Sequence, residues 1–428
     1  MPGDSLDNLD DFLAFLHASP TPFHAVVEAR RRLEAAGFRA LGEADAWDGL
    51  APGRYHVTTS ETNLIAFVLP PGAEGRTRYR IVGAHTDSPN LRLKPHAEYT
   101  SEGYAQLGVE VYGGALLNSW LDRDLGIAGR VIVREGDKEG EGFASHLVRL
   151  DRPLVRVPQL AIHLDREVNE KGLVLDRQNH LAPVWGLAGG PALSQLVADA
   201  IGVAPDRIAA SDLMLHDAVA PAIGGASNEL LFSARLDNLA MCHASITALA
   251  AAAPGAQSIA VVALFDHEEV GSNSAAGAGS STLPRMLERL VPSREAFHQA
   301  CARSTCVSAD MSHAVHPNYA SRHEPRHKPV LNGGPVIKTN TQQRYATNAA
   351  TAAMFARLCR DEDVPVQHYA HRTDLPCGST IGPITSTLLG IPTVDVGNPM
   401  LSMHSAREMA GTRDPALMNR VLARYLRS

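Results

Sequence analysis

The chain has 428 residues, of which 45% are apolar and 20% are charged, and its formal net charge is −7. This composition excludes the disordered, fibrous and collagen-like classes, and the negative charge leaves no overall basic field for nucleic acid or acidic lipid. Two features depart from ordinary usage: 19 histidines, and only five lysines among 39 basic residues.

The cysteines and the N-terminus bear on the compartment. Five cysteines without CxxC spacing argue against a disulfide framework or a structural zinc knuckle. Four aspartates stand among the first 11 residues, where a signal peptide needs positive charge, and no run approaches the ~20 apolar residues of a membrane span. We therefore expect a cytoplasmic protein that binds neither membranes nor nucleic acid.

The first 92 residues have an α/β pattern. Apolar spacing predicts two helices followed by two strands, at Leu6–His17, Ala25–Ala36, Asn63–Leu69 and Tyr79–Gly83. The second strand runs into His85 and Asp87, which places two polar side chains at its carboxyl end. Open α/β sheets usually have their functional sites at that edge.

The pattern changes between residues 93 and 232, where short β-like runs alternate with Gly and Pro. After this β-rich insertion the α/β alternation resumes, with helices and strands predicted at Leu239–Ala252, Ser258–Phe265, Ala346–Arg360, Thr393–Val396 and Pro415–Leu426. We therefore predict an α/β domain made of residues 1–92 and 233–428, interrupted by a β-rich domain at 93–232.

Glu268 and Glu269 are hard to explain as ordinary surface residues. They follow the apolar run Ser258–Phe265, so two adjacent carboxylates emerge from a buried strand beside Asp266 and His267. Burying like charges costs free energy unless a cation or a proton compensates. This pattern favours a cation site.

Other polar clusters at strand ends or helix starts could each be a turn, a helix cap or a structural histidine when taken singly. Together with the glutamate pair, these clusters provide two histidines and four carboxylates: His85, Asp237, Glu268, Glu269, Asp310 and His404. A pair of divalent ions about 3.5–4 Å apart can use this set, with one imidazole and one carboxylate on each ion and a carboxylate bridging them. One carboxylate then stays available as a general base.

Seven segments resemble the aspartyl aminopeptidase family of two-metal exopeptidases. They occur in the family's order along nearly the whole chain: VGAHTDSPNLRLKP, ARLDNLA, FDHEEVGS, SADMSHAVHPNY, GPVIKTNTQQRYATN, PCGSTIGPI and MHSAREM. The resemblance implies a three-layer α/β/α metallopeptidase domain and identifies the β-rich insertion as a dimerisation domain.

The resemblance also implies the metal ligands. Asp237 would bridge two divalent ions, His85 and Asp310 would complete one site, and Glu269 and His404 would complete the other. Zinc is the expected metal, with manganese and cobalt as alternatives, because mixed nitrogen and oxygen sites accept several ions.

The implied reaction is the removal of N-terminal residues, preferentially Asp or Glu, from peptides by a hydroxide that bridges the ions. Glu268 would be the general base, and Asp87 would orient His85 through the second imidazole nitrogen. The expected partners are peptides with free acidic N-termini.

Lys338 is the candidate for specificity. Read alone, it is a solvated lysine on a loop, but the resemblance implies that it pairs with the acidic side chain of the substrate's first residue, and lysine is scarce in this chain. Tyr345, His313 and Gly378 would line the same pocket.

His163 alternates with apolar residues, which by itself predicts a structural histidine on a strand. The resemblance instead implies that it enters the active site of a neighbouring subunit and stabilises the oxyanion there. It further implies self-association into dimers and a tetrahedral dodecamer.

Two alternatives remain open from the sequence. One is a related two-metal deacylase or carboxypeptidase, which would accept peptides with acetylated N-termini. The other is a non-catalytic peptide-binding assembly, against which the complete ligand set and Glu268 argue.

Overall fold

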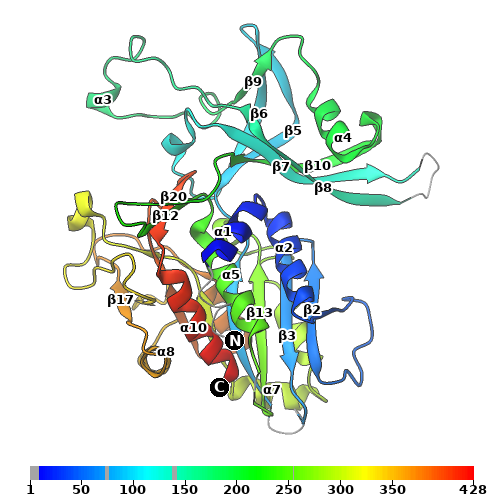
Figure 1. Ribbon diagram of the computed structural model, residues 1–428, viewed down its shortest axis with the longest axis vertical. Coiled ribbons are helices and arrows are strands. Elements are labelled where there is room, and N and C mark those ends of the chain that lie inside the picture. Colours follow the sequence, from blue (N-terminus) through cyan, green and yellow to red (C-terminus); the bar gives the residue numbers. More distant parts are fainter. Residues whose placement is uncertain (1–8, 73–76, 137–141, 254) are drawn as a thin grey trace. The chain divides into compact units, whose positions relative to one another are not determined.

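The computed structural model describes residues 9–72, 77–136, 142–253 and 255–428, which form two compact units (Figure 1). The first unit comprises the chain up to Asp87, Pro221–Met403 and Glu408–Ser428, and the second comprises Ser88–Ala220 with His404–Arg407. The second unit begins before the predicted border at residue 93, because its strand at Asn90–Ser101 starts earlier, and its main segment ends at Ala220 rather than at residue 232.

A nine-stranded sheet forms the centre of the first unit, in the order β1-β2-β3-β13-β4-β14-β18-β16-β17. The central strands β13, β4, β14 and β18 pair in parallel, whereas β3 and β16 run antiparallel to them. The bounds are Arg39–Ala40 (β1), Gly53–Thr59 (β2), Asn63–Leu69 (β3), Arg78–His85 (β4), Ser258–Phe265 (β13), Thr305–Ala309 (β14), Val336–Thr339 (β16), Gln367–Ala370 (β17) and Thr393–Gly397 (β18).

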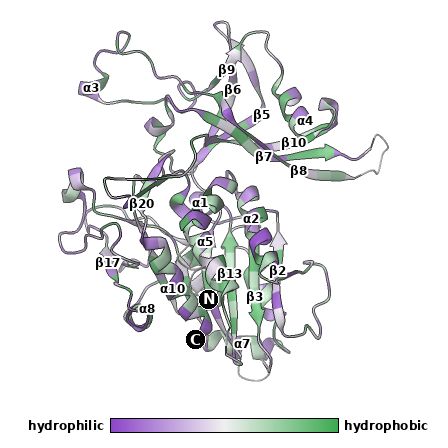
Figure 2. Cartoon of the chain, in the orientation of Figure 1, coloured by the Kyte–Doolittle hydropathy of each residue, from purple (hydrophilic) through white to green (hydrophobic). Residues whose placement is uncertain are grey.

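Helices cover both faces of this sheet, because side chains of a strand alternate between the faces. In β13, Val262 packs in one core with α1, α2, α5, α8 and α10, while Val261 packs in another with α6, α7 and α9. The bounds are Leu9–Ala18 (α1), Pro22–Ala35 (α2), Leu236–Ala250 (α5), Thr282–Glu288 (α6), Arg294–Ala302 (α7), Ala349–Asp361 (α8), Ile381–Leu389 (α9) and Asp414–Arg427 (α10). Figure 2 shows β3 and β13 as hydrophobic, as expected for strands buried on both faces. The predicted α/β/α fold is confirmed.

Most predicted elements of this unit are present, and the strands at 63–69 and 258–265 have the predicted bounds. Helix α8 begins three residues later than predicted because Asn348 caps it, accepting hydrogen bonds from the backbone amides of Ala350 and Thr351. The first three residues of the helix predicted at 6–17 lie outside the described residues.

A second, smaller sheet of the first unit has the order β11-β12-β20-β19-β15. Its strands are Ala222–Gly224 (β11), Leu230–Ser233 (β12), Ser312–His313 (β15), Pro399–Leu401 (β19) and Glu408–Gly411 (β20). It brings the segment after Asp310 next to the segment after β18, because β15 pairs with β19. Short 3₁₀ turns occur in both units at Leu117–Trp120, Pro205–Arg207, Glu268–Val270 and Pro317–Arg322.

The second unit contains a six-stranded antiparallel sheet in the order β8-β7-β10-β5-β6-β9. Its elements are Asn90–Ser101 (β5), Tyr104–Tyr112 (β6), Leu125–Arg134 (β7), Phe143–Val155 (β8), Val168–Lys171 (α3), Val184–Leu187 (β9), Leu193–Ile201 (α4) and Ile208–Asp217 (β10). Among the helices described in either unit, none has the length and apolar character that crossing a membrane requires.

Candidate metal centre

The candidate metal centre lies where neighbouring parallel strands of the large sheet end. His85 is the last residue of β4 and pairs with Phe265, the last residue of β13. Glu268 follows the end of β13, and Asp310 follows the end of β14. Since the carboxyl ends of parallel strands meet at one edge of a sheet, residues far apart in the chain come together here.

Carboxylates surround the imidazole of His85. Its Nε2 lies 3.5 Å from Oδ1 of Asp237 and 3.7 Å from Oδ1 of Asp310. One donor atom each of His85, Asp237 and Glu269 lies within 4.8 Å of the others. Burial by itself would lower the pKa of His85, but the carboxylates of Asp237, Asp310 and Asp87 outweigh burial and raise that pKa well above its usual value.

Asp87 holds both His85 and the glutamate pair in place. Its carboxylate Oδ1 lies 3.3 Å from Nδ1 of His85, and its backbone carbonyl oxygen lies 3.0 Å from the same nitrogen. The two carboxylate oxygens accept hydrogen bonds from the backbone amides of Glu268 and Glu269, at 3.2 and 3.1 Å. Because these contacts engage Nδ1, Nε2 is the nitrogen that faces Asp237 and Asp310.

Asp237 enters the cluster from the start of α5, where its backbone angles and those of Asn238 are not helical. The side-chain amide of Asn238 donates a 2.9 Å hydrogen bond to the carbonyl of Ala309, the last residue of β14. The carboxylate of Glu408 accepts a hydrogen bond from the backbone amide of Asp237 at 3.2 Å. These contacts connect the start of the helix to the edge of the sheet and direct Asp237 toward His85.

Glu268 is partly buried among like charges. Burial raises the pKa of its carboxyl to about 8, His85 opposes this shift, and the carboxylates of Asp310, Asp87 and Asp237 reinforce it. A divalent cation on the neighbouring ligands would lower that pKa, because an opposite charge favours the ionised form. A carboxyl group that can gain or lose a proton near neutral pH is suited to acid–base catalysis.

The donor atoms fit a divalent metal ion. They comprise an imidazole nitrogen and several carboxylate oxygens, which zinc accepts at about 2.0–2.2 Å. Buried carboxylates in this number also require positive charge close by. The distances of 3.5 to 3.7 Å from Nε2 to the carboxylates of Asp237 and Asp310 are short enough for one ion to contact all three side chains.

A protein-family model described as aminopeptidase I zinc metalloprotease (M18) matches residues 15–425. The chain belongs to the M18 aminopeptidase family. It is therefore a metal-dependent aminopeptidase, and the resemblance to the aspartyl aminopeptidases, which the M18 family includes, is confirmed.

Relatives of this M18 aminopeptidase match along its length. A probable M18 family aminopeptidase 2 from Streptomyces avermitilis is 49% identical over 428 residues, covering 97% of each chain. A protein of the same name from Pseudomonas aeruginosa is 48% identical over 421 residues, covering 97% of this chain and 96% of the other.

Solved structures also superpose on it. The complex of Ape4 and Nbr1 contains a chain with a TM-score of 0.95 and 39% identity, covering 100% of this chain and 86% of the other. Chaetomium thermophilum mApe1 has a TM-score of 0.88 and 32% identity, covering 100% and 98% of the two chains.

Of the four residues predicted to bind substrate, Lys338 is in direct contact with a candidate metal ligand, Asp310. It is 2% exposed, and its Nζ lies 3.6 Å from Oδ2 of Asp310 and donates a 3.1 Å hydrogen bond to the carbonyl of Met311. The ring of Tyr345 lies 5.1 Å from the same nitrogen. Lys338 is therefore not a solvated loop lysine, which was the alternative reading.

His313 and Gly378 are more exposed than Lys338 and Tyr345. The ring of His313 packs edge-on against Tyr369 at 5.7 Å, and Tyr369 packs against Tyr345 at 6.4 Å. His313 thus contacts the aromatic cluster that includes Tyr345.

Two predicted site residues belong to the second unit. His404 lies in the returning segment His404–Arg407, where its Nδ1 is 3.1 Å from the carbonyl of Gly114. His163 lies in an exposed turn. The strand predicted around His163 is therefore wrong: the chain between β8 and β9 turns repeatedly, and α3 is its one described helix.

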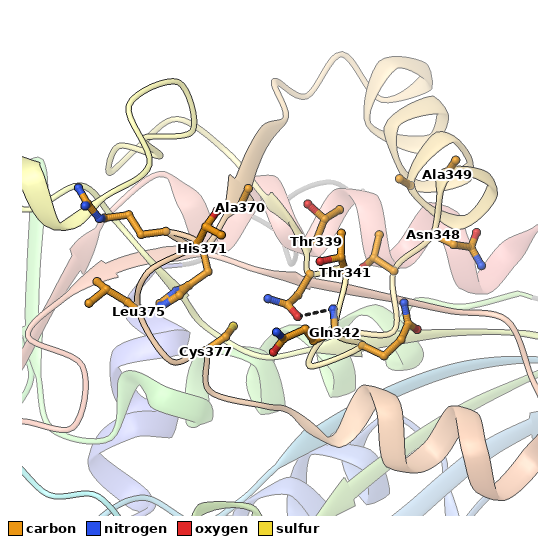
Figure 3. A pocket seen from close by; sticks show the side chains of 15 residues that line it. Thr339, Thr341, Gln342, Asn348, Ala349, Ala370, His371, Leu375 and Cys377 are labelled. Carbon is orange, nitrogen blue, oxygen red and sulfur yellow. Dashed lines mark hydrogen bonds between the residues drawn. The ribbon is translucent and has the colours of Figure 1, made fainter.

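A cavity of about 530 Å³ adjoins the Tyr345 cluster (Figure 3). Hydroxyl and carboxamide groups dominate the residues around it: Thr339, Asn340, Thr341, Gln342, Gln343, Thr347, Asn348, Ala349, Ala352, Ala370, His371, Arg372, Thr373, Leu375 and Cys377. Arg372 is paired with Asp374 by two hydrogen bonds of 2.8 and 2.7 Å, and Cys377 packs against Tyr345. None of the candidate metal ligands lines this cavity, so it is separate from the metal centre.

Asn238 and Glu408 support Asp237, and the sequence assigned a role to neither of them nor to the buried Asp395. Asn238 and Glu408 hold Asp237, as described above. Asp395 lies inside the predicted strand Thr393–Val396, where an acidic residue between valines was a signal that could have identified it.

Replacing Asp87 by Asn should weaken zinc binding about 10–100-fold, because the group that orients His85 and holds the glutamate amides loses its charge. The measurement is competition for zinc with a chromophoric chelator. Asp414→Asn is a matched control, since Asp414 is also buried and accepts two backbone amide hydrogen bonds, at 2.7 and 2.9 Å. Equal zinc affinity in wild type, Asp87→Asn and Asp414→Asn would contradict the role of Asp87.

Proposed function

We propose that this M18 aminopeptidase removes acidic residues, Asp and Glu, from the N-termini of peptides with the help of two divalent ions per subunit. The observation that carries the proposal is a buried ammonium group, Lys338, within 3.6 Å of Asp310, a proposed metal ligand. Zinc is the expected metal, since the family is one of zinc metalloproteases.

The surroundings of Lys338 support a role in selecting acidic substrates. An ammonium group has three donors, and the contacts of Lys338 are the carbonyl of Met311 and the carboxylate of Asp310. At low exposure its charge is poorly screened, so a substrate carboxylate nearby gains more than a neutral side chain does. The ring of Tyr345 restricts the ammonium group from another side.

The ligands divide between two ions in this proposal. His85 and Asp310 would hold one ion, Glu269 and His404 would hold the other, and Asp237 would contribute to both; the donor atoms of His85, Asp237, Asp310 and Glu269 that lie close together support this division. Bound ions would polarise the scissile carbonyl and make a water molecule acidic enough to lose a proton near neutral pH.

Glu268 performs the proton transfers in this proposal. It takes the proton of the attacking water and returns it to the leaving amine. Two features support this role: its place beside Glu269, and the hydrogen bond from its backbone amide to Asp87, which fixes the segment. The surrounding carboxylates also favour a positively charged substrate α-amino group over a blocked one.

Glu268→Gln should lower kcat about 10²–10⁴-fold and leave the bound zinc unchanged, because the amide has a similar shape but cannot accept the proton. Turnover of an aminoacyl anilide and the zinc content of the purified protein are the measurements. Glu269→Gln is the adjacent control and should lose zinc as well as activity. A Glu268→Gln variant with wild-type turnover would contradict the assignment of the base.

Lys338→Met should lower kcat/KM for an N-terminal Asp substrate about 10–100-fold relative to a Leu substrate, because a charge-assisted hydrogen bond is lost. The two anilides are assayed side by side at equal zinc loading. Lys328→Met, at an exposed lysine of the same unit, should keep the wild-type ratio. If Lys338→Met also keeps that ratio, Lys338 does not select acidic residues.

The second unit contributes to the site through self-association in this proposal. The segment around His163 exposes large apolar side chains: Leu160 at 58%, Leu164 at 74% and Val174 at 84%. Exposed apolar groups in one segment are typical of protein–protein contacts. A related S. cerevisiae structure is an mApe1 dodecamer, and we propose dimers and a dodecamer for this chain as well.

If His163 acts in the partner's site, two inactive variants should restore activity when mixed. Subunits carrying His163→Ala and subunits carrying Glu268→Gln, unfolded and refolded together, should recover roughly a quarter of wild-type activity, since each mixed dimer has one complete site. Each variant refolded alone is the control. No recovery in mixed oligomers, verified by mass spectrometry, would place His163 outside the partner's site.

A further inference from the structure

We propose that Asp395 is a positioning residue for substrate selection, which holds Lys338 and the segments that carry Tyr345 and Gly378. The proposal rests on the role of Lys338 proposed above.

Asp395 lies in the middle of β18 and is fully buried. In the antiparallel pairing of β16 with β18, Asp395 is directly opposite Lys338. Side chains of directly opposite residues lie on the same face of a sheet with their Cβ atoms about 4.5–5.5 Å apart. A buried acid and a buried base are therefore neighbours, and Nζ of Lys338 also lies 3.6 Å from Oδ2 of Asp310.

Each carboxylate oxygen of Asp395 holds a different segment. Oδ1 accepts a 2.6 Å hydrogen bond from the hydroxyl of Thr380, two residues after Gly378. Oδ2 accepts a 2.6 Å hydrogen bond from the backbone amide of Ala346, directly after Tyr345. One side chain of β18, the strand that pairs with the strand of Lys338, thus holds the segments of Tyr345 and Gly378.

The close packing of Gly382 restricts Asp395 further. A Cβ atom at Gly382 would lie 2.4 Å from each carboxylate oxygen of Asp395, a distance that no side chain can occupy. The backbone amide of Asp395 also donates a 2.9 Å hydrogen bond to Thr347. These contacts restrict the position of the Asp395 carboxylate and of Thr380 and Ala346, which donate hydrogen bonds to it.

These contacts indicate which property should change when Asp395 changes. The carboxylate's hydrogen bonds to Thr380 and Ala346 go to the segments of proposed substrate-binding residues. Its connections to the proposed metal ligand Asp310 are indirect: they pass through Ser308, two residues earlier in the chain, and through Lys338, whose Nζ lies 3.6 Å from Asp310. Loss of the charge of Asp395 should therefore raise KM for acidic substrates more than it changes zinc binding or the proton transfer by Glu268.

The test compares Asp395→Asn with Asp414→Asn, a second fully buried aspartate of the same unit, which bonds the backbone amides of Asn332 and Gly334. Asp395→Asn should lower the ratio of kcat/KM for Asp over Leu anilide about tenfold, mainly through KM of the Asp substrate. Asp414→Asn should keep the wild-type ratio. Melting temperature, zinc content and oligomeric state are recorded for both variants.

A merely structural role would lower the melting temperature of both variants and leave both ratios unchanged, and that result would overturn the proposal. If Asp395→Asn does not fold, Thr380→Ala removes one bond to the carboxylate and should shift the ratio in the same direction, while Thr380→Ser restores it. An unchanged ratio in Thr380→Ala would then overturn the proposal.

The outcome for Lys338 separates this proposal from the proposed function. If Lys338→Met keeps the wild-type ratio, the assignment of acidic specificity fails. If Lys338→Met lowers the ratio while Asp395→Asn and Thr380→Ala do not, only the positioning role of Asp395 fails.

Discussion

Buried negative charge at one edge of the large sheet is the constraint on which the rest of the site depends. Asp87, Asp237 and Asp310 are buried there with Glu268 and Glu269 beside them, and such a group is stable only with positive charge close by. Metal ions, His85 and Lys338 can each supply it. The surrounding hydrogen bonds, from the amides that Asp87 accepts to the bond between Asn238 and β14, keep these groups within reach of such charges.

The charged side chains of the large sheet form two groups, one beyond the ends of the strands and one within the strands. The carboxylates of the metal centre lie beyond the ends of β4, β13 and β14, while Asp395 and Lys338 face each other within β18 and β16. The ion pair of Lys338 with Asp310 connects the two groups. The residues proposed for catalysis and those proposed for substrate selection therefore belong to one network of neighbouring charges.

The strand order explains how a discontinuous unit assembles such a site. β4 lies between β13 and β14, although more than 150 residues separate β4 from either neighbour in the chain. The inserted second unit accounts for much of that separation, and its own six-stranded sheet and core are complete without the large sheet. An insertion of this kind leaves the parallel pairing intact because it enters between β4 and β11, outside the pairing of β4 with β13 and β14.

Local patterns in the sequence determined the buried strands and predicted the candidate ligands of a metal centre. Uninterrupted apolar runs specified β3 and β13, and acidic residues and histidines at strand ends marked the candidate ligands. The Asn348 cap that begins α8 is a local contact, with the amides of Ala350 and Thr351, which apolar spacing does not report. The pairing of Asp395 with Lys338, by contrast, joins residues distant in the chain. Strand order alone makes these two residues neighbours, because apolar periodicity reports which face of a strand is buried and not which strand lies beside it.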